Sequence, residues 1–426
     1  MVNYANITIW GNLVGIVSWD NARQVASFEY DPKFVAGNLD LSPIKMPLEA
    51  GKIYSFPELN AKTYNGLPGL LADSLPDKFG NALINKWLAE QGRDADSYNP
   101  IERLLYQGKR GMGALEFEPA ERIAANTSSR IELEHLITAA RNALSAKEQL
   151  NTGLTNAEEL AQIIKVGTSA GGARAKAVIA FNEKTGEIRS GQTNAPEGFS
   201  HWLIKLDGVT NNELGDPQHF GQIEYAYYKM AIACGIEMSA SRLLSENGRY
   251  HFMTRRFDRA GNKEKIHMHT LCGMAHFDFN APGAYSYEQL FQTMRTLRLP
   301  YHDAEQVFRR MTFNIAARNQ DDHTKNFSFL MDKTGKWRLS PAYDMTYSYN
   351  PSGEYTAFHQ LSINGKRGEF TKDDLLHVAK SMNIKKPAEI IEEVINTVSQ
   401  WRKIAAELEI PNETITMIER THCFLK

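Results

Sequence analysis

The sequence predicts an α+β fold in which a small amino-terminal unit precedes two lobes, the first rich in strands and the second mainly helical. Short strand-type runs alternate with turn residues up to about residue 120. From Ile163 onward strand-type runs surround a glycine-rich segment, and beyond Tyr285 apolar residues recur at helical spacing. We therefore expect domains at residues 1–125, 126–257 and 258–426.

Composition excludes several classes of protein. The 426 residues are 42% apolar, enough for large cores, and 48 basic against 50 acidic residues leave a formal charge of −2. A chain-wide basic surface for non-specific nucleic-acid binding is therefore excluded, although a local basic patch stays open. The three cysteines form no Cys-x-x-Cys pair, which argues against a disulfide scaffold or a cysteine zinc site. With no signal-peptide pattern and no apolar run of about 20 residues, we expect a soluble cytoplasmic protein without a membrane partner.

The amino-terminal unit begins with strand-type runs and continues with a helix. The expected elements are strands at Ile7–Trp10, Leu13–Trp19, Val25–Tyr30 and Ala114–Phe117, with a helix from about Asp77 to Gln91. The three glycines between Gly108 and Gly113 could cradle a phosphate or form a tight turn. Because no helix pattern follows them directly, we favour the turn.

The rest of the chain passes from strands to helices. We expect a helix over 130–150, strands at 163–166, 177–181 and 201–206, a helix over 223–234, strands at 243–246 and 251–257, helices over 287–297 and 304–318, and a hairpin over 327–339. A capping pattern from Thr371 to Asp374 and a helix opened by Pro387 complete the carboxyl-terminal part.

The strongest chemical signal is the run Asn319-Gln-Asp-Asp-His-Thr-Lys-Asn326. Asp321 and Asn326 have the Asp-x-x-x-x-Asn spacing of protein kinases, in which the acid orients the attacking hydroxyl and the amide binds Mg²⁺. The hairpin that follows would return Asp344 beside Asn326 and so complete a metal site. The alternative is that these residues cap turns around a hairpin, with Lys325 a solvated charge.

Two neighbours of Asp321 compete with it or assist it. Asp322 is a rival for the role of catalytic base, and the spacing to Asn326 favours Asp321. His323 is a second candidate base, or it holds the loop by hydrogen bonds.

Glycines between two expected strands form the second signal. Gly167 and Gly172 have the spacing of a Walker A loop, but Ala173 replaces the lysine and a strand follows, so a P-loop enzyme is disfavoured. A glycine-rich loop between strands, lying over ATP phosphates as in kinases, fits better, because glycines let backbone N–H groups approach an anion closely. An ordinary glycine-rich hairpin remains the alternative.

Lys205 is the third signal, because it interrupts the apolar strand-type run Trp202–Leu206. An inward ammonium needs an anionic partner. ATP phosphates and Glu224, at the start of the next helix, would supply one, as in the lysine and glutamate pair of kinases. The alternative is an edge-strand lysine in solvent. His267 and His269 share one strand face without a third metal ligand, so we expect them on the surface.

Taken together, these segments resemble the HipA family of serine/threonine kinases, the toxins of bacterial toxin–antitoxin pairs. The resemblance covers nearly the whole chain. It is carried by Asp73-Ser-Leu-Pro-Asp77, Gly111-Met-Gly-Ala-Leu115, the segment Gly167–Lys176, Arg256-Phe-Asp-Arg259, the run Asn319–Asn326 and Ser340-Pro-Ala-Tyr-Asp344. It implies a bilobal, protein-kinase-like fold of the phosphoinositide-kinase-like type, with an additional amino-terminal α+β domain.

The resemblance also implies roles for residues. Asp321 would be the catalytic acid, assisted by Lys205 and His323, and Asn326 and Asp344 would bind Mg²⁺. The residues expected to bind ATP are Gly167, Ser169, Gly171, Gly172, Lys205, Glu224, Arg256, Phe257 and Lys325, with backbone groups of 256–257 meeting the adenine. Ser169 is the expected autophosphorylation site, whose modification would withdraw the loop and switch the kinase off. Ala175 departs from the family, since many relatives carry proline there.

The implied partners are a small HipB-like helix-turn-helix antitoxin, operator DNA bound through it, and a protein substrate such as an aminoacyl-tRNA synthetase. A homodimer stays open. Two other functions also stay open: a small-molecule phosphotransferase using the same residues, and a non-catalytic co-repressor that acts only with an antitoxin.

Overall fold

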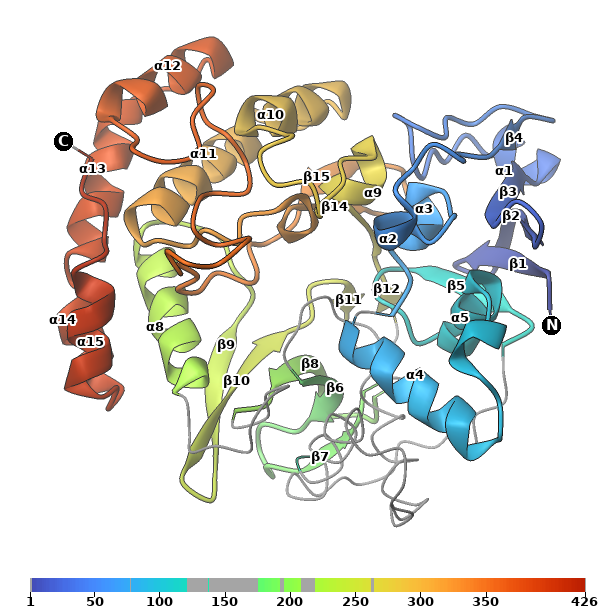
Figure 1. Cartoon of the computed structure of the whole chain (residues 1–426), viewed down its shortest axis with the longest axis horizontal. Coiled ribbons are helices and arrows are strands. Elements are labelled where there is room, and N and C mark those ends of the chain that lie inside the picture. Colours follow the sequence, from blue (N-terminus) through green and yellow to red (C-terminus); the bar gives the residue numbers. More distant parts are fainter. Residues whose placement is uncertain are drawn as a thin grey trace.

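A computed structural model of the chain describes residues 2–76, 78–120, 137, 175–191, 195–207, 219–261 and 264–425. The helix expected over 130–150, apart from Ile137, and the strand expected over 163–166 lie outside these residues. Figure 1 shows an amino-terminal unit on the right, a strand-rich lobe below and a mainly helical lobe above. The α+β architecture expected from the sequence is therefore confirmed.

The amino-terminal unit is a five-stranded antiparallel sheet with strand order β4-β3-β2-β1-β5. Its strands are β1 (Tyr4–Ile9), β2 (Asn12–Asp20), β3 (Val25–Tyr30), β4 (Ile53–Tyr54) and β5 (Leu115–Glu118). Its helices are α1 (Pro32–Ala36), α2 (Ala61–Tyr64), α3 (Gly69–Ala72), α4 (Lys78–Glu90) and α5 (Pro100–Gln107), with a short 3-10 turn η1 (Ala95–Ser97). Strand β5 follows the glycines of residues 108–113 directly, so this segment is a turn, as expected.

The strand-rich lobe, called the N-lobe below, contains a second antiparallel sheet with strand order β7-β6-β8-β10-β9. Its elements are β6 (Lys176–Phe181), β7 (Ile188–Ser190), β8 (Ser200–Lys205), α8 (Phe220–Ala233), β9 (Ser241–Glu246) and β10 (Arg249–Arg255). Helix α8 packs on β9 and β10. The contact is close because Gly221 has no side chain: a Cβ there would lie 2.1 Å from the Tyr250 carbonyl oxygen.

The helical lobe, called the C-lobe below, surrounds a three-stranded sheet with strand order β13-β14-β15. Its strands and short turns are β11 (Arg259–Ala260), β12 (Glu264–Lys265), β13 (His267–Thr270), η2 (Thr324–Asn326), β14 (Ser328–Met331) and β15 (Trp337–Leu339). Its helices are α9 (Leu271–Ala275), α10 (Tyr287–Thr296), α11 (Tyr301–Ala316), α12 (Lys372–Met382), α13 (Pro387–Val398), α14 (Trp401–Glu407) and α15 (Asn412–Glu419). Thr371 and Asp374 form the expected capping box of α12, and Pro387 opens α13.

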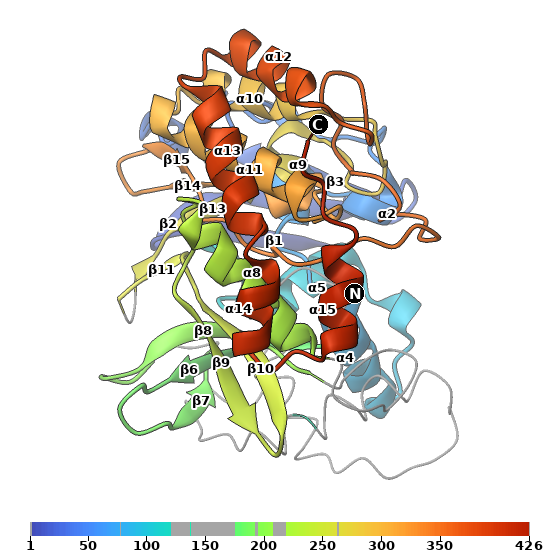
Figure 2. The same cartoon turned by 90° about the vertical axis from the view of Figure 1, so that its left-hand side faces the viewer.

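The N-lobe sheet is held from two sides. On one side, α8 shares a core with α13 and α14, to which Tyr227 and Trp401 contribute. On the other side, Leu83, Ile84 and Leu88 of α4 pack into the core of the N-lobe sheet. Figures 1 and 2 show α4 and α8 on opposite sides of this sheet. The amino-terminal unit therefore contacts the N-lobe through a helix that lies inside the domain expected at 1–125.

The expectation that His267 and His269 lie on the surface is wrong. His267 is fully buried and its Nε2 lies 3.3 Å from the Leu41 carbonyl oxygen. His269 is 1% exposed, and its Nδ1 lies 2.7 Å from Asp73 Oδ2. Both partners come from the amino-terminal unit, about 200 residues away in sequence, so local spacing could not reveal the burial.

Within the described ranges, no helix is both long and apolar enough to cross a membrane.

The burial of His267 predicts an acid-sensitive contact between the amino-terminal unit and the C-lobe. Burial, with a further contribution from His269, lowers the pKa of His267 to about 3. In the unfolded chain the pKa of histidine is about 6.5, so between these values only the unfolded state takes up the proton. Stability should therefore fall as the pH drops from 7 to 5, and His267 should account for about 2 kcal/mol of that loss.

Urea unfolding of the wild type and of His267→Asn at both pH values measures this contribution. All other groups are common to the two proteins, so the difference between the two pH-dependent losses isolates His267. Equal losses in both proteins would show that His267 is not held neutral by the fold.

Candidate active site

Lys205 lies between two carboxylates from different parts of the fold. It ends β8, and its Nζ donates a hydrogen bond of 2.5 Å to Oε1 of Glu224, in α8. Nζ also donates to Oδ1 of Asp344, in the loop that follows β15. The side chain of Lys205 is 12% exposed and that of Glu224 is 3% exposed. The pair of Lys205 and Glu224 expected from the sequence is therefore present, and Asp344 joins it from the C-lobe.

The ion cluster keeps Lys205 and Asp344 charged. Burial by itself would lower the pKa of Lys205, but Asp344 and Glu224 outweigh burial and raise that pKa above its ordinary value. Burial by itself would raise the pKa of Asp344, but Lys205 and Lys176 hold it well below its ordinary range. An ionised carboxylate and a protonated amine thus coexist where Lys205 of the N-lobe meets Asp344 of the C-lobe, at neutral pH.

Lys176 is a candidate site residue that the sequence analysis did not assign a role. It begins β6 and is the register partner of Lys205 on the neighbouring strand β8. It is 4% exposed and acts on the charge of Asp344. The positive charges of two lysines therefore act on one carboxylate. In the sequence, the signal for a role of Lys176 is its position at the start of an apolar strand-type run. Only the strand register places it beside Lys205.

The loop between α11 and η2 separates the two neighbouring aspartates. Asp322 is buried, where it accepts hydrogen bonds from the Tyr287 hydroxyl (2.8 Å) and the Gln360 N–H (2.7 Å), and contacts His359 Nδ1 (2.9 Å). Its carboxylate therefore holds the loop in place. The side chain of Asp321 is 45% exposed, so it is the one that can reach a substrate.

The side chains that follow Asp321 arrange this loop. Asn326 Nδ2 donates to the Asp321 carbonyl oxygen at 2.7 Å, so the amide oxygen is the end of Asn326 that can bind a metal. His323 Nε2 lies 3.8 Å from Asp321 Oδ1, and the His323 ring packs on Phe279. The amine of Lys325 lies 4.5 Å from the centre of the Phe279 ring, a cation–π contact.

Tyr343 joins the loop of Asp321 to the segment that carries Asp344. Its hydroxyl donates to the Lys325 carbonyl oxygen at 2.6 Å and also contacts the Ser328 hydroxyl. Arg310 of α11 holds the start of the same segment, because its Nη2 donates to the Ser340 carbonyl oxygen at 2.7 Å. The segment with Asn326 and the segment with Asp344 are thereby fixed against each other.

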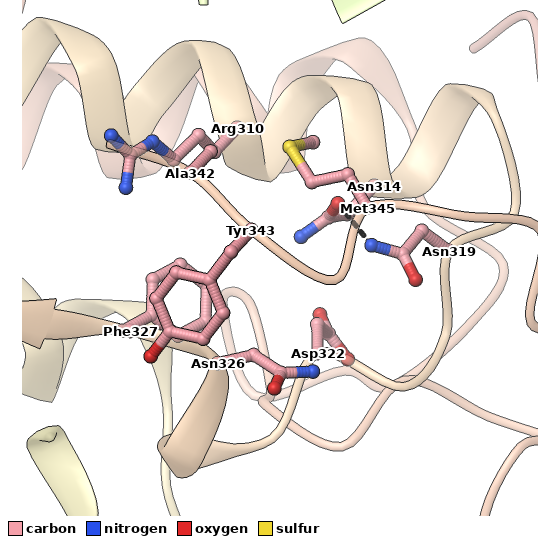
Figure 3. A pocket seen from close by; sticks show the side chains of 9 residues that line it. All are labelled: Arg310, Asn314, Asn319, Asp322, Asn326, Phe327, Ala342, Tyr343 and Met345. Carbon is pink, nitrogen blue, oxygen red and sulfur yellow. Dashed lines mark hydrogen bonds between the residues drawn. The ribbon is translucent and has the colours of Figure 1, made fainter. Parts of the chain in front are cut away.

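A small pocket is lined by residues of both segments. Figure 3 shows Asn326 and Asp322 on one side and Tyr343 and Arg310 on the other. The remaining lining residues are Asn314, Asn319, Phe327, Ala342 and Met345. Arg310 Nε and Nη1 and Asn319 Oδ1 are buried and have no hydrogen-bond partner among the described residues, so ordered water fits their chemistry.

The residues present fit a magnesium ion. Mg²⁺ prefers oxygen ligands and is commonly held by one or two protein groups together with substrate phosphates. The amide oxygen of Asn326 and the ionised carboxylate of Asp344 are ligands of this kind. Asp344 has a left-handed backbone with φ of 53°, a conformation that aspartate adopts more readily than most residues.

Of the other residues expected to bind ATP, Arg256 and Phe257 are described by the structure and the glycine-rich loop is not. Gly167, Ser169, Gly171 and Gly172 lie outside the described residues. Arg256 is buried: its guanidinium pairs with Asp258, and its backbone N–H donates to the His201 carbonyl oxygen. Phe257 packs against Tyr343 with ring centres 5.6 Å apart, which places the segment between the lobes beside the residue before Asp344.

Comparisons with known proteins agree with this arrangement. One similar solved structure is a toxin–antitoxin complex of HipA, HipB and operator DNA from Shewanella oneidensis. The match covers 98% of this chain and 94% of the matched chain, with a TM-score of 0.67 and 16% sequence identity. A likeness at this identity shows the bilobal fold.

Curated relatives match parts of the chain. A protein of Haemophilus influenzae named as a candidate kinase is 24% identical over 232 residues, which cover 47% of this chain and 67% of that protein. A candidate kinase of Sinorhizobium fredii is 27% identical over 152 residues, or 34% of this chain and 33% of the relative.

Family models cover most of the chain. The HipA N-terminal domain matches residues 5–118, and the HipA-like C-terminal domain matches residues 168–402, more than half of the sequence. The second match includes both lysines, Glu224 and the two loops that carry Asp321 and Asp344. The chain therefore belongs to the HipA family.

Proposed function

We propose that this protein is an ATP- and Mg²⁺-dependent serine/threonine protein kinase of the HipA toxin type. The observation that carries the proposal is the position of Lys205 between Glu224 and Asp344, because Tyr343 holds the segment of Asp344 beside the loop of Asp321 and Asn326. A lysine paired with a helix glutamate, an acid exposed to substrate, and two oxygen ligands for metal are the parts that phosphoryl transfer between ATP and a hydroxyl requires. Kinase names among the curated relatives support the same reaction.

Each side chain has a separate task in this mechanism. Lys205, protonated and oriented by Glu224, binds phosphate oxygens of ATP. Asp321 accepts a hydrogen bond from the acceptor hydroxyl, aims its oxygen at the γ-phosphorus and takes up its proton as the new phosphate ester forms. ADP leaves when the bond between the γ-phosphorus and the bridging oxygen breaks. Mg²⁺, held by Asn326 and Asp344, would offset the negative charge on the phosphates.

The type of acceptor and the partners rest on family membership. A seryl or threonyl side chain of a protein, such as an aminoacyl-tRNA synthetase, is the proposed acceptor, and Ser169 is the proposed site of self-inactivation. A HipB-like antitoxin that links the protein to DNA is the proposed partner, because the structurally similar Shewanella protein was solved with HipB and operator DNA. A cytoplasmic location, where ATP is abundant, stays a prediction.

Replacement of Asp321 tests the proposed catalytic acid. Asp321→Asn keeps the shape of the side chain but removes the base, so phosphoryl transfer should fall about 10²- to 10⁴-fold. Intact and peptide mass spectrometry after incubation with Mg-ATP should show one added phosphate at Ser169 in the wild type and none in the variant. Asp373→Asn, at an exposed position in the first turn of α12, is the matched control and should react like the wild type.

Normal transfer by Asp321→Asn would remove Asp321 from the mechanism. If the folded wild type binds ATP and adds no phosphate to any protein, the proposed protein kinase is wrong. Phosphate on an added metabolite or antibiotic would then identify a small-molecule phosphotransferase, and no turnover at all would favour the co-repressor.

Removal of the Lys205 ammonium should separate stability from activity. Lys205→Met leaves the buried carboxylate of Glu224 unpaired, which should cost about 3 kcal/mol of folding free energy. Adding Glu224→Gln removes the unpaired charge and should restore most of that stability, measured by urea unfolding, without restoring phosphoryl transfer. Recovery of transfer in the double variant would show that Lys205 matters only as a structural counter-ion.

A further inference from the structure

The segment that joins the two lobes is held by a buried carboxylate with four donors. Asp258 is fully buried and accepts hydrogen bonds from Arg256 Nε (2.9 Å) and Nη2 (2.6 Å), from Arg259 Nη1 (2.7 Å) and from the Gly113 N–H (2.7 Å). Burial by itself would raise the pKa of Asp258, but the two arginines hold that pKa well below its ordinary range. Three residues of the segment 256–259 are thus tied to one another and to the amino-terminal unit.

The amino-terminal unit contributes backbone groups from both ends of a short turn. The Gly111 carbonyl oxygen accepts from Arg256 Nη2 at 3.2 Å and from Arg259 Nη2 at 2.9 Å, and the Gly113 carbonyl oxygen accepts from Arg259 Nη1 at 3.0 Å. Gly113 has φ of 73°, and a Cβ there would lie 3.1 Å from the backbone nitrogen of Met268. Glycine is therefore required for this turn to lie so close to the segment between the lobes.

A second contact fixes the same unit to the C-lobe. Helices α3 and α9 lie so close that a Cβ on Gly69 would be 2.3 Å from the Gly273 carbonyl oxygen. Beside them, Asp73 Oδ2 accepts from the Thr270 N–H at 2.8 Å, and Asp73 Oδ1 accepts from the Thr270 hydroxyl at 2.7 Å. Thr270 is the N-cap of α9, so Asp73 anchors the amino-terminal unit where this helix begins.

The same unit reaches the N-lobe through α4. Leu83, Ile84 and Leu88 are fully buried and share a core with Ile179 and Ile204 of the N-lobe sheet. The contact is apolar and forms on the side of the sheet away from α8. The amino-terminal unit therefore contacts the C-lobe, the segment between the lobes and the N-lobe.

We propose that the amino-terminal domain is a brace that sets the angle between the two lobes, and that Asp258 is the positioning residue through which it acts on the site. Phe257, the residue before Asp258, packs on Tyr343, which precedes the metal ligand Asp344. Fixing the segment 256–259 therefore also restricts Tyr343 and the adjacent Asp344, whose carboxylate accepts a hydrogen bond from Lys205 of the N-lobe. The effect on catalysis rests on the proposed kinase function, whereas the mechanical brace does not.

The distance between the lobes tests the brace without any ligand. Spin labels on Glu183→Cys, in an exposed turn of the N-lobe sheet, and Lys380→Cys, exposed on α12, report this distance by pulsed electron resonance once the three native cysteines are replaced by serine. We expect one narrow distance distribution for the otherwise unchanged chain. Asp258→Asn, which removes an acceptor for buried arginines, should at least double its width.

Two further variants keep the test decisive if Asp258→Asn does not fold. Gly113→Ala disturbs the turn at its point of contact, and Ile84→Ala loosens the packing of α4 on the N-lobe sheet. Both should broaden the distribution. Leu290→Ala, in the core of the C-lobe and outside the hydrogen bonds of Asp73 and Asp258 described above, is the control: it should lower the thermal midpoint by a similar amount and leave the width unchanged.

Steady-state kinetics distinguish a positioning role of Asp258 from a purely structural one, because only a positioning role changes the KM for ATP. If the lobes have the productive angle only 10 to 30% of the time, the apparent KM for ATP should rise about three- to ten-fold, with kcat reduced less than two-fold. A folded Asp258→Asn or Gly113→Ala protein with the narrow distribution and unchanged KM would overturn the proposal. If no variant or wild-type protein transfers phosphate, the proposed function fails, and the width of the distance distribution alone still decides on the brace.

Discussion

The buried ammonium of Lys205 is the interaction on which the arrangement of the two lobes depends. A charge removed from water is tolerated only when opposite charge is close. Glu224 supplies it from α8 and Asp344 from the loop after β15, so the N-lobe sheet, its packed helix and the C-lobe must meet at one point. A nucleotide would enter this cluster as a third source of negative charge, and the register partner Lys176 adds a second positive charge to that of Lys205.

A second buried cluster, formed by Asp258 with Arg256 and Arg259, holds the two lobes in position. Asp258 and its two arginines hold the segment between the lobes to the turn at Gly111 and Gly113. The first cluster places the reacting groups and the second limits how far they can separate. Since catalysis by positioning is lost when reacting groups move by about an ångström, an additional domain that braces the lobes has a direct chemical use.

Local patterns were sufficient to predict most of the fold and the order of the site residues. The apolar alternation of the first three strands, the capping box at Thr371 and the hairpin before Asp344 are all readable over a few residues, and all are present. The pairing of Lys205 with Glu224 also followed from the cost of burying a lone ammonium. The glycine-rich loop around Ser169 lies outside the described residues, and its role stays a prediction.

What the sequence could not reveal depends on contacts between distant segments. Asp321 and Asp322 are chemically identical neighbours, and only the packing of Tyr287 and His359 around Asp322 shows which one holds the loop. His267 is buried by residues of another domain, and Arg256 binds Asp258 and a backbone carbonyl of the amino-terminal unit. These partners are about 35 to 230 residues apart in sequence, apart from Asp258 itself.

The most direct measurement of the central claim is the position of a metal ion bound with nucleotide. Crystals grown with a non-hydrolysable ATP analogue and Mn²⁺ in place of Mg²⁺ would locate the metal by its anomalous scattering. The account predicts a peak within about 2.5 Å of the Asn326 amide oxygen and an Asp344 carboxylate oxygen, with a phosphate oxygen beside the amine of Lys205. A nucleotide bound elsewhere, or a metal that touches neither residue, would contradict it.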